Sequence, residues 1–95
     1  MKPALGSQIR ILPLTLHREY FGQIASGIKK YEFRDLTPYW KARLEGRNYD
    51  VIRFRNGYHR DAPEMLVEFL GCEKQGSSYA IKLGKILKIE RWPKA

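Results

Sequence analysis

The sequence is poor in the residues that bind metals or form disulfides. Cys72 is the only cysteine, and His17 and His59 are the only histidines in the 95 residues. One thiol cannot form a disulfide within the chain or a cysteine-based zinc site, and two histidines without supporting ligands make no metal centre. We therefore expect a reduced, cytoplasmic protein that needs no metal and no other cofactor, with Cys72 as inert packing.

Long apolar runs and nucleotide-binding loops are also missing. No segment approaches the roughly 20 apolar residues that cross a bilayer. The first seven residues, MKPALGS, contain no apolar stretch of the length that a secretory signal needs. The chain has no glycine-rich phosphate loop and no plausible Ser/His/Asp order. These absences predict no membrane contact and argue against an enzyme that uses nucleoside triphosphates.

Acidic residues are scarce beside basic ones. Asp plus Glu number 10 and Lys plus Arg number 18, which gives a formal net charge of +8. Such an excess favours a polyanionic partner, usually nucleic acid, although it also serves solubility alone. The apolar fraction of 43% argues against disorder. The length suits a single domain, 1–95, with its core over roughly 9–91.

The hydrophobic pattern changes between periods of two and of 3.6 residues along the chain. Thr15 and Thr37 are predicted helix caps, and Gly27 and Gly46 are predicted helix ends. Strands are predicted over 10–14, 29–35, 50–56, 65–72 and 79–92, and helices over 16–26 and 38–45. Five or six strands with two short helices predict a mainly β, α+β fold in which the sheet closes into a compact barrel.

Residues 27–34, GIKKYEFR, join the first helix to the next strand and concentrate charge at the edge of the core. In a regular strand Lys30, Glu32 and Arg34 share one face, so one interpretation is a solvated face that contributes about 0.5 kcal/mol through pairing. The other interpretation is a functional site. A lysine and a carboxylate pressed together in a sheltered place are suited to proton transfer.

The spacing Gly-x-Lys-x-x-Glu-x-Arg after an amphipathic helix resembles the signature of ASCH domains, which have a PUA-like β-barrel fold. LTLHREYF at 14–21, PYW at 38–40 and FRNGY at 54–58 fit the same family, so the resemblance covers roughly 9–90. It implies a cleft beside the first helix, lined by Lys29, Glu32 and Arg34 and associated with RNA or nucleosides. Some small stand-alone bacterial and phage members are amidohydrolases that remove acyl groups from N4 of cytidine.

This sequence departs from the amidohydrolase pattern at one position. Those enzymes carry a nucleophilic threonine three residues after the lysine, where this chain has Glu32. The resemblance also implies a separate carboxylate, for which Glu68 and Glu73 are the candidates. We therefore expect Glu32 to orient or deprotonate a water, and Lys29 to stabilise the oxyanion or protonate the leaving nitrogen. The family spacing selects Lys29, whereas strand alternation selects Lys30 unless a turn near Gly27 intervenes.

Several polar and aromatic side chains are candidates for binding a substrate. Arg34 has a planar fork suited to an acyl oxygen, a phosphate or a base edge. Tyr20 and Tyr58 are candidates for stacking on a base. Asn56 offers a donor and an acceptor to a base edge, although Asn-Gly is also ordinary turn chemistry.

Three other side chains have two interpretations each. Trp40 fits the core, at helical spacing with Leu44, or stacking on a base. Arg53 and Arg55 either follow a phosphate backbone or form the wet face of a strand.

Three functions are consistent with these residues. The first is hydrolysis of an acylated nucleobase, with N4-acylcytidine as the preferred class and a modified nucleoside or RNA as partner. The second is a non-catalytic RNA-binding module that grips a single-stranded or modified base with the same residues. The third is single-stranded RNA cleavage, which ranks lowest because neither histidine belongs to the motif. Oligomeric state leaves no signature in the sequence.

Overall fold

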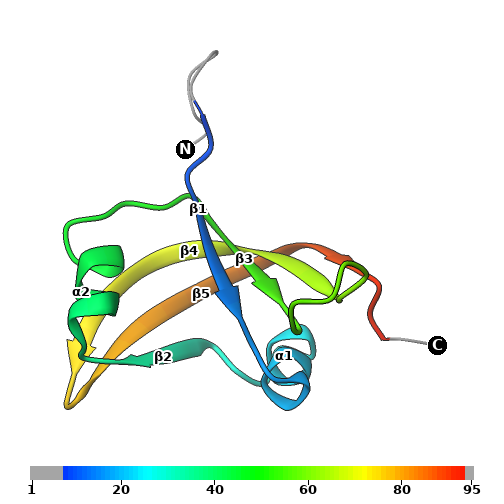
Figure 1. Cartoon of the computed structure of the whole chain (residues 1–95), viewed down its shortest axis with the longest axis horizontal. Coiled ribbons are helices and arrows are strands. Elements are labelled where there is room, and N and C mark those ends of the chain that lie inside the picture. The colour runs from blue at the N-terminus through cyan, green and yellow to red at the C-terminus, as the bar shows by residue number, and fades with distance from the viewer. Residues whose placement is uncertain (1–7, 94–95) are drawn as a thin grey trace.

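The computed structural model describes residues 8–93 of the chain and contains five strands and two helices there (Figure 1). In chain order the elements are β1 (Ile11–Thr15), α1 (Arg18–Ala25), β2 (Tyr31–Asp35), α2 (Pro38–Leu44), β3 (Val51–Arg55), β4 (Glu64–Gln75) and β5 (Ser78–Glu90). The predicted mainly β fold with two short helices is confirmed, with five strands. None of the helices described within residues 8–93 has the length and apolarity needed to span a membrane.

The five strands form one sheet in the order β1-β3-β4-β5-β2. β1 and β3 are parallel, and the other neighbours are antiparallel. The sheet curls into a half-barrel around the long hairpin of β4 and β5 (Figure 1). α1 lies where β1 ends and β2 begins, and α2 lies beside the turn of the hairpin. The two helices therefore stand at different ends of β2.

Alternating apolar side chains from every strand except β2 meet on the concave side of the sheet. Phe21 and Ile24 of α1 and Leu44 of α2 close over them, and Phe21 is completely buried. The strand members of this core are Leu12, Leu14, Ile52, Phe54, Met65, Val67, Tyr79, Ile81 and Leu83. Burying a side chain of this size contributes about 2 kcal/mol. β2 instead directs Glu32 inward, across from Ile81.

The helix boundaries show which local signals were decisive. Thr37 caps α2 as predicted, because its Oγ1 accepts the N–H of Trp40 at 3.2 Å. The prediction that Thr15 caps the first helix is wrong. Thr15 is paired with Arg55 as the last residue of β1, and α1 begins after His17, whose side chain makes no capping bond. Gly27 ends the helical region with a φ of +82°, a conformation that favours glycine.

The hairpin of β4 and β5 bends through three irregularities in its register, between Leu66 and Val67, Val67 and Phe69, and Phe69 and Cys72. The second lies opposite Gly84, where the sequence predicts a bulge or corner. A Cβ at Gly84 would lie 2.8 Å from the Cβ of Glu68, so any larger residue requires the strands to move apart. Bulges of this kind let a short sheet curl strongly enough to enclose a core.

Candidate functional site

Glu32 is the one charged residue that is buried in the part of the chain between residues 8 and 93, with 4% of its surface exposed. It reaches this position because β2 alternates, sending Glu32 and Arg34 toward the inside and Tyr31 and Phe33 outward. An ionised carboxylate without partners would be strongly destabilising in such a place. The geometry around Glu32 is therefore the centre of the candidate site.

Two cations hold the two oxygens of Glu32 separately. Arg34 donates from Nε at 3.1 Å and from Nη2 at 2.8 Å to Oε2. Lys29 Nζ lies 2.9 Å from Oε1, close enough for an ion pair, but its orientation does not satisfy a hydrogen bond, so Oε1 receives no donor. Oε2 is consequently fixed by two hydrogen bonds, whereas Oε1 retains lone pairs for another partner.

The turn after α1 decides which lysine meets Glu32. The N–H groups of Ile28 and Lys29 both bond to the carbonyl of Gln23, and β2 begins only at Tyr31. Lys29 thus precedes the regular strand and is not bound by its alternation. Lys30 is exposed and forms no ion pair within the described range of the chain.

Each cation of the site also lies over an aromatic ring from a helix. Lys29 Nζ is 4.8 Å from the centre of the Tyr20 ring of α1, and the guanidinium carbon of Arg34 is 5.0 Å from the Trp40 ring of α2. A contact of this kind contributes about 0.5–1 kcal/mol at an exposed site. Trp40 is half-buried against the core, whereas Tyr20 is 42% exposed.

The connection between β1 and α1 links Asn56 to the same site. Arg34 Nη2 donates to the carbonyl of Thr15 at 3.2 Å, and Asn56 Nδ2 donates to the next carbonyl, that of Leu16, at 3.1 Å. Arg34 and Asn56 therefore hold successive peptide groups. Asn56 also donates its backbone N–H to the carbonyl of Pro63, which closes the loop after β3. The Asn56 side chain therefore bonds to the segment before α1, in addition to the turn that Asn-Gly predicts.

Other candidate residues lie outside this cluster. Tyr58 is 89% exposed in the loop after β3. Glu68 accepts the N–H of Lys85 at 2.9 Å, and Glu73 accepts a bond from Gln75, so neither carboxylate contacts Lys29 or Arg34.

The two arginines of β3 differ in their partners. Arg55 Nη1 pairs with Glu64 at 3.2 Å, whereas Arg53 forms no ion pair within residues 8–93. The Nε of each arginine is buried without a hydrogen-bond partner. No group of three or more potential metal ligands occurs among the residues that the structure covers.

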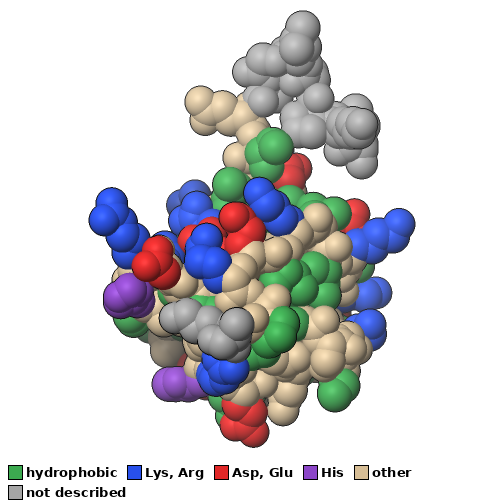
Figure 2. Space-filling model, turned by 90° about the vertical axis from the view of Figure 1, so that its right-hand side faces the viewer, with side chains coloured by type: hydrophobic (Ala, Val, Ile, Leu, Met, Phe, Trp, Pro, Cys, Tyr) green, Lys and Arg blue, Asp and Glu red, His purple; other side chains and the backbone are tan. Residues whose placement is uncertain are grey.

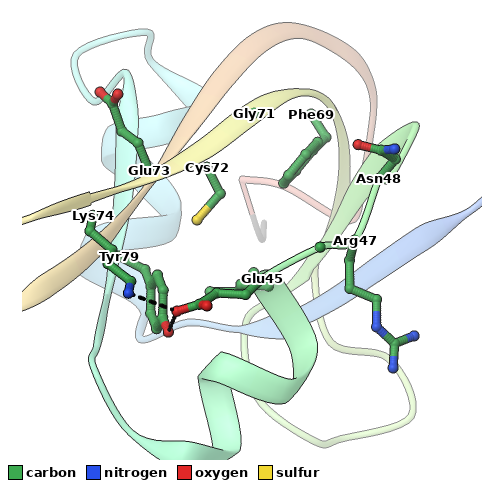
Figure 3. Close-up of a pocket in the computed structure, with 11 residues that line it drawn as sticks. Glu45, Arg47, Asn48, Phe69, Gly71, Cys72, Glu73, Lys74 and Tyr79 are labelled. Atoms are coloured by element: carbon green, nitrogen blue, oxygen red, sulfur yellow. Dashed lines mark hydrogen bonds and ion pairs between the residues drawn. The ribbon is translucent and has the colours of Figure 1, made fainter.

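A hollow of about 570 Å³ lies away from this cluster, between the end of α2 and the β4–β5 hairpin (Figure 3). Tyr79 donates its hydroxyl to Oε2 of Glu45 at 2.5 Å, and Lys74 lies 3.2 Å from the same oxygen. The carboxylate raises the pKa of Tyr79 to about 12, and the bond from Tyr79, with help from Lys74, lowers the pKa of Glu45. Burial is the main cause that raises the pKa of the Cys72 thiol.

Sequence reasoning missed this second cluster. Glu45 and Tyr79 are 34 residues apart and belong to separate parts of the fold, so no local residue spacing predicts their contact. Tyr79 fits a buried strand position, and Glu45 fits the end of a helix. Only the strand register and the exit of α2 bring them together.

Replacing Tyr79 with Phe is expected to change how stability depends on pH. The Tyr79 pKa rises from 10 to about 12 on folding, so the Glu45–Tyr79 bond stabilises the protein fully below pH 10 and is lost as the pH rises toward 12. The Tyr79→Phe protein should lack this part of the alkaline decline. Urea unfolding followed by circular dichroism between pH 8 and 12 measures the difference, and parallel curves for both proteins would contradict the assignment.

Neither the known family models nor the curated protein sequences give a match to this chain. The Lys29–Glu32–Arg34 cluster is therefore interpreted from its own chemistry.

Proposed function

We propose that the protein hydrolyses the amide of an acylated nucleobase, with N4-acylcytidine as the preferred substrate class. The observation that supports this most is the buried Glu32 carboxylate, which has one oxygen fixed by Arg34 and the other beside the Lys29 ammonium without a donated hydrogen bond. A base and an acid held side by side are what water attack on an amide requires. The resemblance of GIKKYEFR to the ASCH signature supplies the substrate class.

In the proposed reaction Glu32 Oε1 accepts a proton from a water molecule as the water oxygen bonds to the acyl carbon. The carbonyl oxygen becomes an oxyanion, which the Lys29 ammonium stabilises. The intermediate then collapses, the bond between the acyl carbon and the exocyclic nitrogen breaks, and that nitrogen receives a proton from Lys29 or from the protonated Glu32. The products are a free carboxylate and cytidine, and no oxidant or metal enters the balance.

The remaining residues position these two groups and the substrate. Arg34 acts mainly through Glu32, because its Nε and Nη2 are already engaged there and at Thr15. Tyr20, half-exposed beside Lys29, offers its ring for stacking on the base. Asn56 fixes the carbonyl of Leu16 beside the site, and Tyr58, 89% exposed in the loop after β3, is assigned a contact with the substrate outside the cluster.

Incubation of the purified protein with N4-acetylcytidine, followed by chromatography of the released cytidine, tests this function. Turnover that rises with enzyme concentration and persists in the presence of a chelator is the expected result. Absence of cytidine from N4-acetylcytidine and from its longer acyl homologues would contradict it.

An RNA-binding module without catalysis is the second candidate. The net charge of +8 favours it. Lys and Arg side chains are spread around the face that Figure 2 shows, with acidic side chains among them. Binding of single-stranded RNA with a steep salt dependence, together with no turnover of any acylated cytosine, would favour this function over the first.

A further inference from the structure

Three lysines from two separate segments meet at a pocket beside Lys29. The pocket has a volume of about 300 Å³ and lies between the end of α1, the start of β2 and the middle of β5. Its lining consists of Ile24, Gly27, Lys29, Lys30, Leu83, Gly84, Lys85 and Ile86. Every charged residue in this lining is therefore a lysine, and the others are apolar or glycine.

The positive charge of this pocket is only partly neutralised. Lys29 is paired with Glu32, on the inner side of β2. Neither Lys30 nor Lys85 has a carboxylate within ion-pair distance among residues 8–93. Glu68, which accepts the backbone N–H of Lys85, is not part of the lining. An anion in the pocket would meet at least two uncompensated ammonium groups.

The negative end of the α1 dipole, which would oppose an anion, is largely satisfied at this corner. The carbonyl of Gln23 accepts from Ile28 and Lys29, and the carbonyl of Ile24 accepts from Gly27. These bonds leave fewer free carbonyl oxygens facing the pocket. Gly27 adds no side chain, and Lys30 Nζ lies 3.9 Å from the place that a Cβ would take there. At Gly84 the corresponding place is filled by Glu68, whose Oε1 lies 2.8 Å from it, so an anion is expected to approach the pocket from the Gly27 side.

We propose that this pocket binds a phosphate group of the substrate, so that the site accepts a nucleotide or single-stranded RNA in preference to a free nucleoside. Lysine ammonium groups recognise phosphate as point charges, and three of them suit one phosphate. Lys29 lines the pocket and also contacts Glu32, which places the phosphate and the base on the two sides of one side chain. The identity of the base in this inference rests on the proposed function, whereas the affinity for phosphate does not.

Binding of cytidine and of cytidine 5′-monophosphate, measured by isothermal calorimetry, tests the pocket without any turnover. The wild-type protein should bind the monophosphate at least about tenfold more tightly. The Lys30→Ala/Lys85→Ala protein should lose this preference and keep its affinity for cytidine. The Lys74→Ala/Lys88→Ala protein is the control, because it removes the same charge from exposed positions outside the pocket. Equal affinities for the two ligands, or equal losses in both variants, would overturn the proposal.

A cytidine-containing single-stranded RNA distinguishes the two sources of phosphate. If RNA is the ligand, the slope of log K against log salt should become shallower by about 0.7 for each phosphate that the Lys30→Ala/Lys85→Ala protein no longer neutralises. If the slope is unchanged while the monophosphate preference disappears, the pocket serves mononucleotides. A monophosphate preference in a protein that hydrolyses no acylcytidine would support the phosphate pocket and reject the hydrolase. Hydrolysis of N4-acetylcytidine by a protein that binds cytidine and its monophosphate equally tightly would support the hydrolase and reject the phosphate pocket.

Discussion

The Glu32→Gln protein is expected to release cytidine from N4-acetylcytidine at least about 100-fold more slowly than the wild type. Glutamine has the size of glutamate and can still accept a bond from Arg34, but it cannot take a proton from water. General acid–base groups contribute about 10²–10⁴ to the rate, so the loss should appear in kcat with little change in KM. Steady-state kinetics with both proteins at saturating substrate measures it.

A matched variant separates the loss of chemistry from the loss of charge. Glu90→Gln makes the same change at an exposed residue of β5, whose only described partners are Lys88 and Arg91. This protein should keep the wild-type kcat. Urea unfolding of the Glu32→Gln protein shows whether it is folded under the assay conditions. A folded Glu32→Gln protein with the wild-type kcat would remove Glu32 from the reaction.

How much of this site was open to prediction depends on how local each signal is. The alternation of GIKKYEFR places Glu32 and Arg34 on one face, and Thr37-Pro38 starts a helix, because these effects act within a few residues. The choice between Lys29 and Lys30 depends on the turn after α1, where two N–H groups share the carbonyl of Gln23. Gly27 is the only feature of the residue pattern that indicates this turn.

Contacts between distant segments were beyond prediction for a different reason. The parallel pairing of β1 with β3 places Arg55 and Asn56 beside the start of α1, yet alternating strands look the same in a parallel and an antiparallel pair. No sequence pattern therefore predicts the hydrogen bond from Asn56 to the carbonyl of Leu16. The lysine pocket is likewise formed by a bend at Gly84, whose position in the sequence predicts a bulge but not what the bulge faces.

The stability of the protein depends on how the buried charge of Glu32 is compensated. A domain of this size has roughly 5–10 kcal/mol of net stability, so one uncompensated charge in the interior consumes a large part of it. Arg34 is the partner that cannot be spared, because it makes both hydrogen bonds to Glu32 and its side chain is 19% exposed. Lys29, 21% exposed, can turn toward water instead.

The Arg34→Met protein is accordingly expected to lose about 3 kcal/mol of its free energy of unfolding, at the lower end of the range for breaking a buried ion pair. Arg60→Met, the same change in the exposed loop after β3, should alter it by less than about 0.5 kcal/mol. The urea midpoint and slope measure both.

The Glu32→Leu/Arg34→Met protein decides between a structural and a functional reason for the pair. Replacing both partners removes the desolvated charges together, so most of the stability lost in Arg34→Met should return. If the pair serves chemistry, this protein is stable and inactive on N4-acetylcytidine. A double variant that is both stable and fully active would show that the buried charges do no catalytic work, whereas one no more stable than Arg34→Met would show that the ion pair itself holds β2 against the core.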